Sequence, residues 1–69
     1  MNAKAQKLLQ EAQNKTQKPS FTLPHYDYGF CMGVIDRSMD LDQLYYYQGT
    51  PMGEGYIEGW LQMDEALDS

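Results

Sequence analysis

The stretch Tyr-Asp-Tyr-Gly-Phe-Cys-Met-Gly-Val-Ile, residues 26–35, has the clearest periodicity in the chain. Large apolar side chains occupy every second position, and mostly small or polar residues stand between them. A repeat of two is typical of a β-strand that buries one face. Gly29 and Gly33 fall on the opposite face, where glycine often marks the close approach of another backbone. The pattern predicts a strand over residues 26–35.

Two further segments are expected to complete a sheet with this strand. Residues 44–48 contain three consecutive tyrosines, which favour half-buried strand positions. In a competing interpretation, Asp40 caps a short helix with Gln43 as its capping-box partner. Residues 49–55 (Gly-Thr-Pro-Met-Gly-Glu-Gly) are expected to form a hairpin loop, and residues 56–63 alternate again. We prefer the strand for the tyrosine segment, which predicts a three-stranded antiparallel meander.

The N-terminal segment has the composition of a helix. Residues 3–17 are dominated by Ala, Gln, Lys, Leu and Glu and contain no Gly or Pro, a strong helix-forming composition. One narrow apolar stripe recurs at helical spacing, formed by Ala5, Leu8, Leu9 and Ala12. Lys18 precedes Pro19, which ends the helix. A helix across one sheet face supplies a second layer, so the predicted fold is α+β, an N-terminal helix packed on a three-stranded antiparallel β-meander.

The chain divides at Pro19 into two parts of opposite charge. All four lysines precede this proline, whereas six tyrosines, two phenylalanines and one tryptophan follow it. Residues 1–18 carry four lysines against Glu11, a net of +3, and the rest carries nine acids against Arg37, a net of −8, which together give −5. We expect one domain made of a basic amphipathic helical arm (1–18), an extended linker (19–25) and an acidic, aromatic-rich β body (26–69).

Catalytic and metal-binding patterns are weak in this chain. His25 and Cys31 are its only histidine and cysteine, and no third group is evident to orient them as a catalytic pair. Residues 36–42 (Asp-Arg-Ser-Met-Asp-Leu-Asp) imitate the first ligand positions of an EF-hand loop. However, Leu41 stands where that loop needs glycine and Tyr47 where it needs glutamate. We therefore expect no enzyme activity, no cofactor and no metal site.

The sequence also gives expectations about the cellular compartment of the protein and about nucleic-acid binding. No charged segment followed by an apolar run suggests a signal peptide, and no stretch approaches the ~18 apolar residues of a membrane span. One cysteine permits no intrachain disulfide, as is usual in reducing compartments. The expectation is a cytoplasmic protein with no membrane partner. The acidic body disfavours direct binding to nucleic-acid phosphates, which requires a basic surface.

The aromatic side chains are the main functional indication. A chain of this length buries only about 60% of its unfolded surface, whereas each aromatic ring offers roughly 150–250 Å². Tyrosine and tryptophan are enriched at protein interfaces, and nearby acids favour a basic partner. The predicted partner-binding residues are Tyr45, Tyr47, Glu54, Tyr56, Glu58 and Trp60. In the competing interpretation, the same rings form the core.

These features predict a small acidic protein-binding protein, an inhibitor or adaptor of the kind encoded by phages and mobile elements. It would occupy a protein with a basic surface, such as a nucleic-acid-processing enzyme, and mimicry of nucleic acid is a special case. The alternative is a small structural subunit of a larger assembly, attached by the apolar stripe of its N-terminal helix. Homodimerisation is compatible with both functions.

Overall fold

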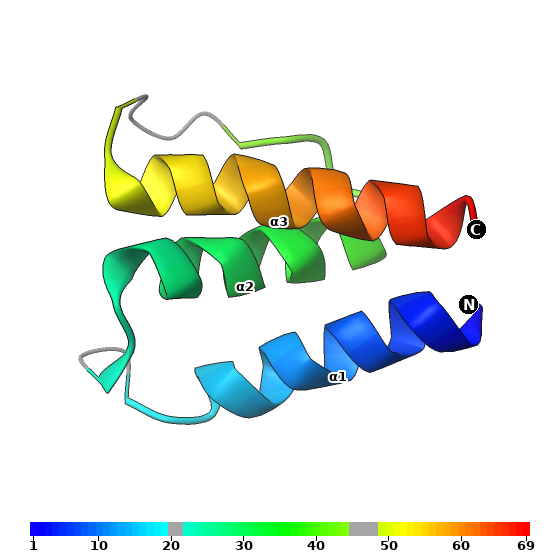
Figure 1. Cartoon of the computed structure of the whole chain (residues 1–69), viewed down its shortest axis with the longest axis horizontal. Coiled ribbons are helices and arrows are strands. Elements are labelled where there is room, and N and C mark those ends of the chain that lie inside the picture. Colours follow the sequence, from blue (N-terminus) through cyan, green and yellow to red (C-terminus); the bar gives the residue numbers. More distant parts are fainter. Residues whose placement is uncertain (20–21, 45–48) are drawn as a thin grey trace.

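The computed structural model describes residues 1–19, 22–44 and 49–69, and the regular structure in these ranges is entirely helical. The helices are α1 (Ala3–Thr16), α2 (His25–Ser38) and α3 (Pro51–Leu67). Figure 1 shows that α2 and α3 run in the same direction and that α1 runs opposite to both. The N- and C-termini consequently lie at the same end of the molecule.

The predicted β-meander is wrong. Residues 26–35 lie within α2 and residues 56–63 within α3, and the described ranges contain no strand. Of the remaining predicted strand, only Leu44 is described, since residues 45–48 lie outside the described residues. The alternation is ambiguous because residues that recur at every second position also recur at every fourth position. Glycines four residues apart line one face of a helix as well as one face of a strand.

Glycine allows α2 and α3 to pack backbone against backbone. Each helix turns two glycines toward the other: Gly29 and Gly33 on α2, Gly55 and Gly59 on α3. A Cβ on Gly33 would collide with the carbonyl oxygen of Tyr56, and each of the other three glycines likewise faces a backbone carbonyl of the opposite helix. At each of these glycines, the Cα hydrogen that stands where a Cβ would be therefore points at a carbonyl oxygen. This is the geometry of a Cα–H···O contact.

This close packing resembles the small-residue crossings of membrane helices. In the part of the chain that the structure describes, however, no helix combines the length and the apolar character needed to cross a bilayer.

α1 covers the α2–α3 pair with the apolar stripe predicted from the sequence. Ala5 is fully buried and Ala12 nearly so, and Leu8 and Leu9 pack against the same core. The core cluster continues through Cys31, Val34, Met63 and Ala66 of the other two helices. The helix predicted over residues 3–17 is thus confirmed as α1, and its stripe is engaged within the chain.

The start of each helix is explained by local sequence. Pro24 immediately precedes α2, and its fixed backbone suits the entry to a helix. Thr50 caps α3 by accepting a hydrogen bond from the Gly53 N–H at 3.1 Å, and Pro51 follows at the first helical position. A hydroxyl cap followed by proline is a common way to begin a helix. These signals set where α2 and α3 begin, whereas the glycines set how they pack.

Asn2 joins the two ends of the chain. Its Oδ1 accepts a hydrogen bond from the Ala5 N–H at 2.8 Å, which caps α1. Its Nδ2 donates to the carbonyl oxygens of Ala66 at 2.8 Å and Ser69 at 3.1 Å, at the end of α3. One side chain therefore satisfies exposed backbone groups on two antiparallel helices.

Replacing Asn2 with alanine is expected to lower the free energy of unfolding by about 1–2 kcal/mol, because the cap and both carbonyl contacts are lost. Urea denaturation followed by far-UV circular dichroism measures the loss. Asn2→Asp keeps the cap acceptor and removes the donor, so it should recover part of the stability. Equal losses in the two variants would contradict the capping role.

Candidate functional site

The four predicted partner-binding residues that the structure describes do not form one surface. Tyr45 and Tyr47 lie outside the described residues. Tyr56 is 0% exposed, whereas Glu54 and Glu58 are exposed on α3. The strand prediction had placed Tyr56, Glu58 and the tryptophan two residues later on one face. A helix instead turns residues two apart to different sides.

Tyr56 belongs to a buried polar network. Its hydroxyl donates a hydrogen bond to the Oδ2 of Asp36 at 2.7 Å and accepts one from the Leu44 N–H at 3.0 Å. Asp36 is itself buried, and its backbone carbonyl accepts from the Leu41 N–H at 3.0 Å. The network ties the segment after α2 to both helices of the glycine-packed pair. Tyr56 is therefore a structural residue.

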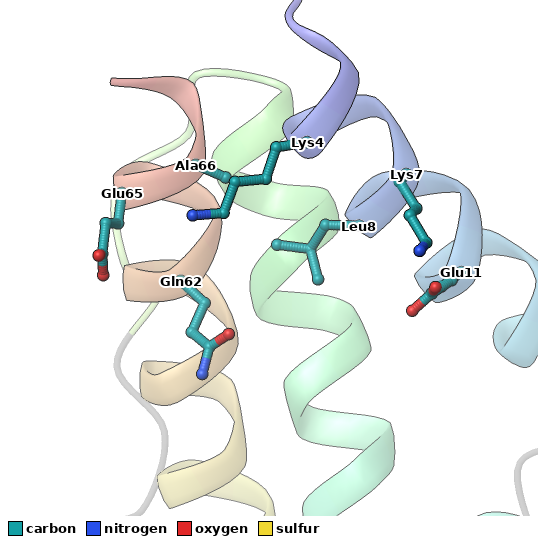
Figure 2. Close-up of a pocket in the computed structure, with 7 residues that line it drawn as sticks. All are labelled: Lys4, Lys7, Leu8, Glu11, Gln62, Glu65 and Ala66. Atoms are coloured by element: carbon teal, nitrogen blue, oxygen red, sulfur yellow. The ribbon is translucent and has the colours of Figure 1, made fainter. Parts of the chain in front are cut away.

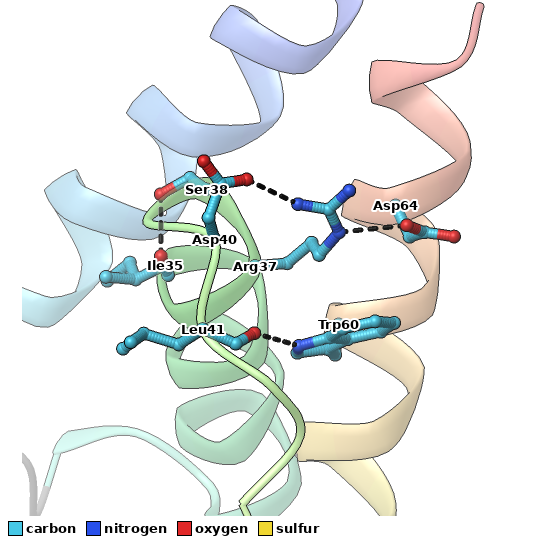
Figure 3. A network of polar contacts seen from close by, with 7 residues as sticks. All are labelled: Ile35, Arg37, Ser38, Asp40, Leu41, Trp60 and Asp64. Atoms are coloured by element: carbon cyan, nitrogen blue, oxygen red, sulfur yellow. Dashed lines mark hydrogen bonds and ion pairs between the residues drawn. The ribbon is translucent and has the colours of Figure 1, made fainter.

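Trp60 holds the same segment from the outside (Figure 3). Its Nε1 donates to the Leu41 carbonyl at 3.0 Å, and the Arg37 guanidinium lies 5.5 Å from the centre of its ring. Arg37 also binds Asp64 at 2.8 Å and Asp40 at 3.0 Å. The hydrogen bond that Arg37 donates to Asp64 is the main reason that the pKa of the guanidinium is raised. Trp60 is only partly buried. However, its indole nitrogen and one face of its ring are both engaged in contacts within the chain.

An exposed acidic stripe runs along α3. We define it as Glu54, Glu58, Leu61, Glu65 and Asp68, whose spacing of four, three, four and three places them on one helical face. Its four carboxylates form no ion pair within the described part of the chain. Leu61, 46% exposed, is the apolar member of the stripe. α3 contains no lysine or arginine to offset this charge.

The acidic stripe includes two of the predicted partner-binding residues and three residues outside that set. Glu54 and Glu58 were expected at the surface, and they are. Leu61 was left out because a strand places residues three apart, such as Glu58 and Leu61, on opposite faces. Glu65 and Asp68 lie beyond the expected strands. The spacing of these residues is visible in the sequence once a helix is assumed.

Cys31 and His25 lie six residues apart on α2, the first buried and the second exposed. Cys31 is 2% exposed, and burial raises the pKa of its thiol, an effect that nearby Lys15 partly offsets and Asp27 reinforces. A buried thiol with a raised pKa is a poor nucleophile. His25 is exposed at the first residue of α2. Among the described residues, no three His, Cys, Asp or Glu side chains are arranged to hold a metal ion.

No protein family, curated protein or solved structure matches this chain. The most distinctive exposed feature is the acidic stripe.

Proposed function

We propose that this chain is a small acidic protein-binding protein, an inhibitor or adaptor that occupies the basic surface of a partner through the acidic stripe of α3. The observation that carries the proposal is a row of exposed carboxylates around Leu61 that form no ion pair with the residues the structure describes. Charge of one sign steers a partner of the other sign and raises the association rate. Leu61 adds apolar contact area within that row.

The proposed surface differs from the predicted one in its aromatic component. Tyr56 is buried and Trp60 supports the segment after α2, so neither is needed to explain binding. Glu54 and Glu58 remain, joined by their neighbours on the same helical face. The partner is a protein with a basic surface, of which a nucleic-acid-processing enzyme is one class.

Charge density argues against full mimicry of nucleic acid. Glu54 and Asp68 are fourteen residues apart, a rise of about 21 Å along a helix. Four carboxylates over that length give one charge per about 7 Å, compared with one per about 3.4 Å along each DNA strand. The stripe has about half the charge density of a single strand. It therefore suits a local basic patch better than a whole nucleic-acid groove.

The alternative function, a structural subunit attached by its N-terminal helix, has less support. Ala5 and Ala12 of the proposed attachment stripe pack into the core of this chain.

We place the protein in the cytoplasm, in keeping with Cys31 as its only, unpaired cysteine.

Charge reversal on the stripe tests the proposed function. In Glu54→Lys/Glu58→Lys, partner affinity at low salt is expected to fall by at least about tenfold, because attraction becomes repulsion. The partner is first captured from the native host with the tagged wild-type chain and identified by mass spectrometry. Its purified form is then measured by surface plasmon resonance against each variant.

Asp27→Lys/Asp42→Lys is the matched control for this experiment. It changes the net charge by the same amount at two exposed acids outside the stripe, and Asp27 lies in the first turn of its helix as Glu54 does. The control should retain most of the affinity. Equal loss in both double variants would refute the stripe as the binding surface.

A further inference from the structure

A groove of about 400 Å³ lies between α1 and α3. Figure 2 shows its two walls, with Leu8 pointing into the space between the helices and the amine of Lys4 extending toward α3. The α1 wall carries Lys4 and Lys7, and the α3 wall carries Gln62 and Glu65. Leu8 and Ala66 supply apolar surface between the walls.

The two walls hold opposite charges that are not neutralised within the chain. In the described ranges, Lys4, Lys7 and Glu65 are all exposed, and none of them forms an ion pair. Glu11 also lines the α1 wall, but it has a lysine four residues away on each side, Lys7 and Lys15. The α1 wall is therefore net positive, whereas the α3 wall is negative.

We propose that this groove is the interface of a symmetric homodimer, in which a second copy of the chain covers it. A two-fold axis along the groove lays the α1 wall of each copy on the α3 wall of the other. The Lys4 and Lys7 ammonium groups then face Glu65 of the partner copy, and the same contact occurs twice. Such an interface is isologous, since one patch is complementary to itself.

The charge pattern favours a second copy over other occupants. A wholly basic partner would be repelled by the α1 wall, and a wholly acidic one by the α3 wall. A copy of the same chain presents both signs in the required arrangement. Glu65 belongs both to this groove and to the acidic stripe of the proposed function, whereas Glu54 and Glu58 do not line the groove.

The small core of the chain also favours self-association. The largest fully buried side chains among the described residues are only Tyr56, Met63 and Val34. Chains of this size commonly gain stability from oligomerisation. A standard interface of about 800 Å² per partner would cover roughly one sixth of the 4715 Å² surface.

Two charge-reversed variants test this arrangement together. Lys4→Glu/Lys7→Glu makes both walls acidic, and Gln62→Lys/Glu65→Lys makes both walls basic. Each variant alone should dimerise at least about a hundredfold more weakly than the wild type, because like charges meet across the interface. An equimolar mixture should form a one-to-one heterodimer, since each acidic wall then meets a basic one. Sedimentation velocity from micromolar to millimolar concentration measures all four samples.

Lys15→Glu/Lys18→Glu is the control, because it makes the same charge change on or just beyond α1 at residues that do not line the groove. It should dimerise like the wild type, and circular dichroism should show native helix content in every variant. A wild-type chain that stays monomeric at millimolar concentration would overturn the proposal. Reversed variants that dimerise normally, or a mixture that fails to pair, would overturn it equally.

Discussion

Replacing Gly33 with alanine is expected to remove most of the net stability of the chain. The added methyl group would collide with the Tyr56 carbonyl oxygen, a backbone atom that cannot move without shifting α3. Overpacking typically costs about 1–3 kcal/mol and occasionally more, and the obstructing backbone atom places this site at the upper end of that range. A chain of this size has a net stability of only about 3–5 kcal/mol. Thermal and urea unfolding monitored by circular dichroism would show the loss.

The sign of this effect is diagnostic, because alanine favours an isolated helix over glycine by about 1 kcal/mol. A destabilised Gly33→Ala variant therefore reports the helix–helix contact and not helix propensity. Gly49→Asn is the control: its φ is +85°, no atom lies within 4 Å of the new Cβ position, and asparagine tolerates this backbone conformation. It should change stability by less than about 0.5 kcal/mol. A Gly33→Ala variant as stable as the wild type would disprove the backbone contact between α2 and α3.

The second large effect is expected for Tyr56→Phe. Loss of the hydroxyl deprives the buried Asp36 carboxylate of a donor and the Leu44 N–H of an acceptor. A buried hydrogen bond to a charged group contributes about 1.5–3 kcal/mol, so unfolding free energy should fall by about 2 kcal/mol. Amide hydrogen exchange at Leu41 and Leu44 should also accelerate, because both amides belong to the network that Tyr56 closes.

Tyr28→Phe is the matched control for this change. Tyr28 is a half-buried tyrosine of α2 whose hydroxyl makes no hydrogen bond within the described residues, so its loss should matter little. A double-mutant cycle of Tyr56→Phe with Asp36→Asn isolates the energy of the pair. Normal stability together with unchanged exchange at Leu44 would show that the network does not hold the segment after α2.

The sequence was most informative where structure is governed by local propensity. α1 is predictable because residues 3–17 contain good helix formers without glycine or proline. Its apolar stripe also identified Ala5 and Ala12 as core residues. Glu54 and Glu58 were predictable as surface acids, since isolated carboxylates are costly to bury.

The parallel pair of α2 and α3 depends on tertiary structure. Glycine within a helix costs about 1 kcal/mol relative to alanine. The intrinsic stability of α2 and α3 is therefore lowered by two glycines each, Gly29 and Gly33 in α2 and Gly55 and Gly59 in α3. Only the backbone of the opposite helix, close enough to exclude a Cβ, compensates for that cost. Composition alone determined the first helix and the acidity of the surface. The contact between the two glycine-lined helices decided how α2 and α3 pack. Their register in turn buries Tyr56 and leaves the acidic stripe exposed.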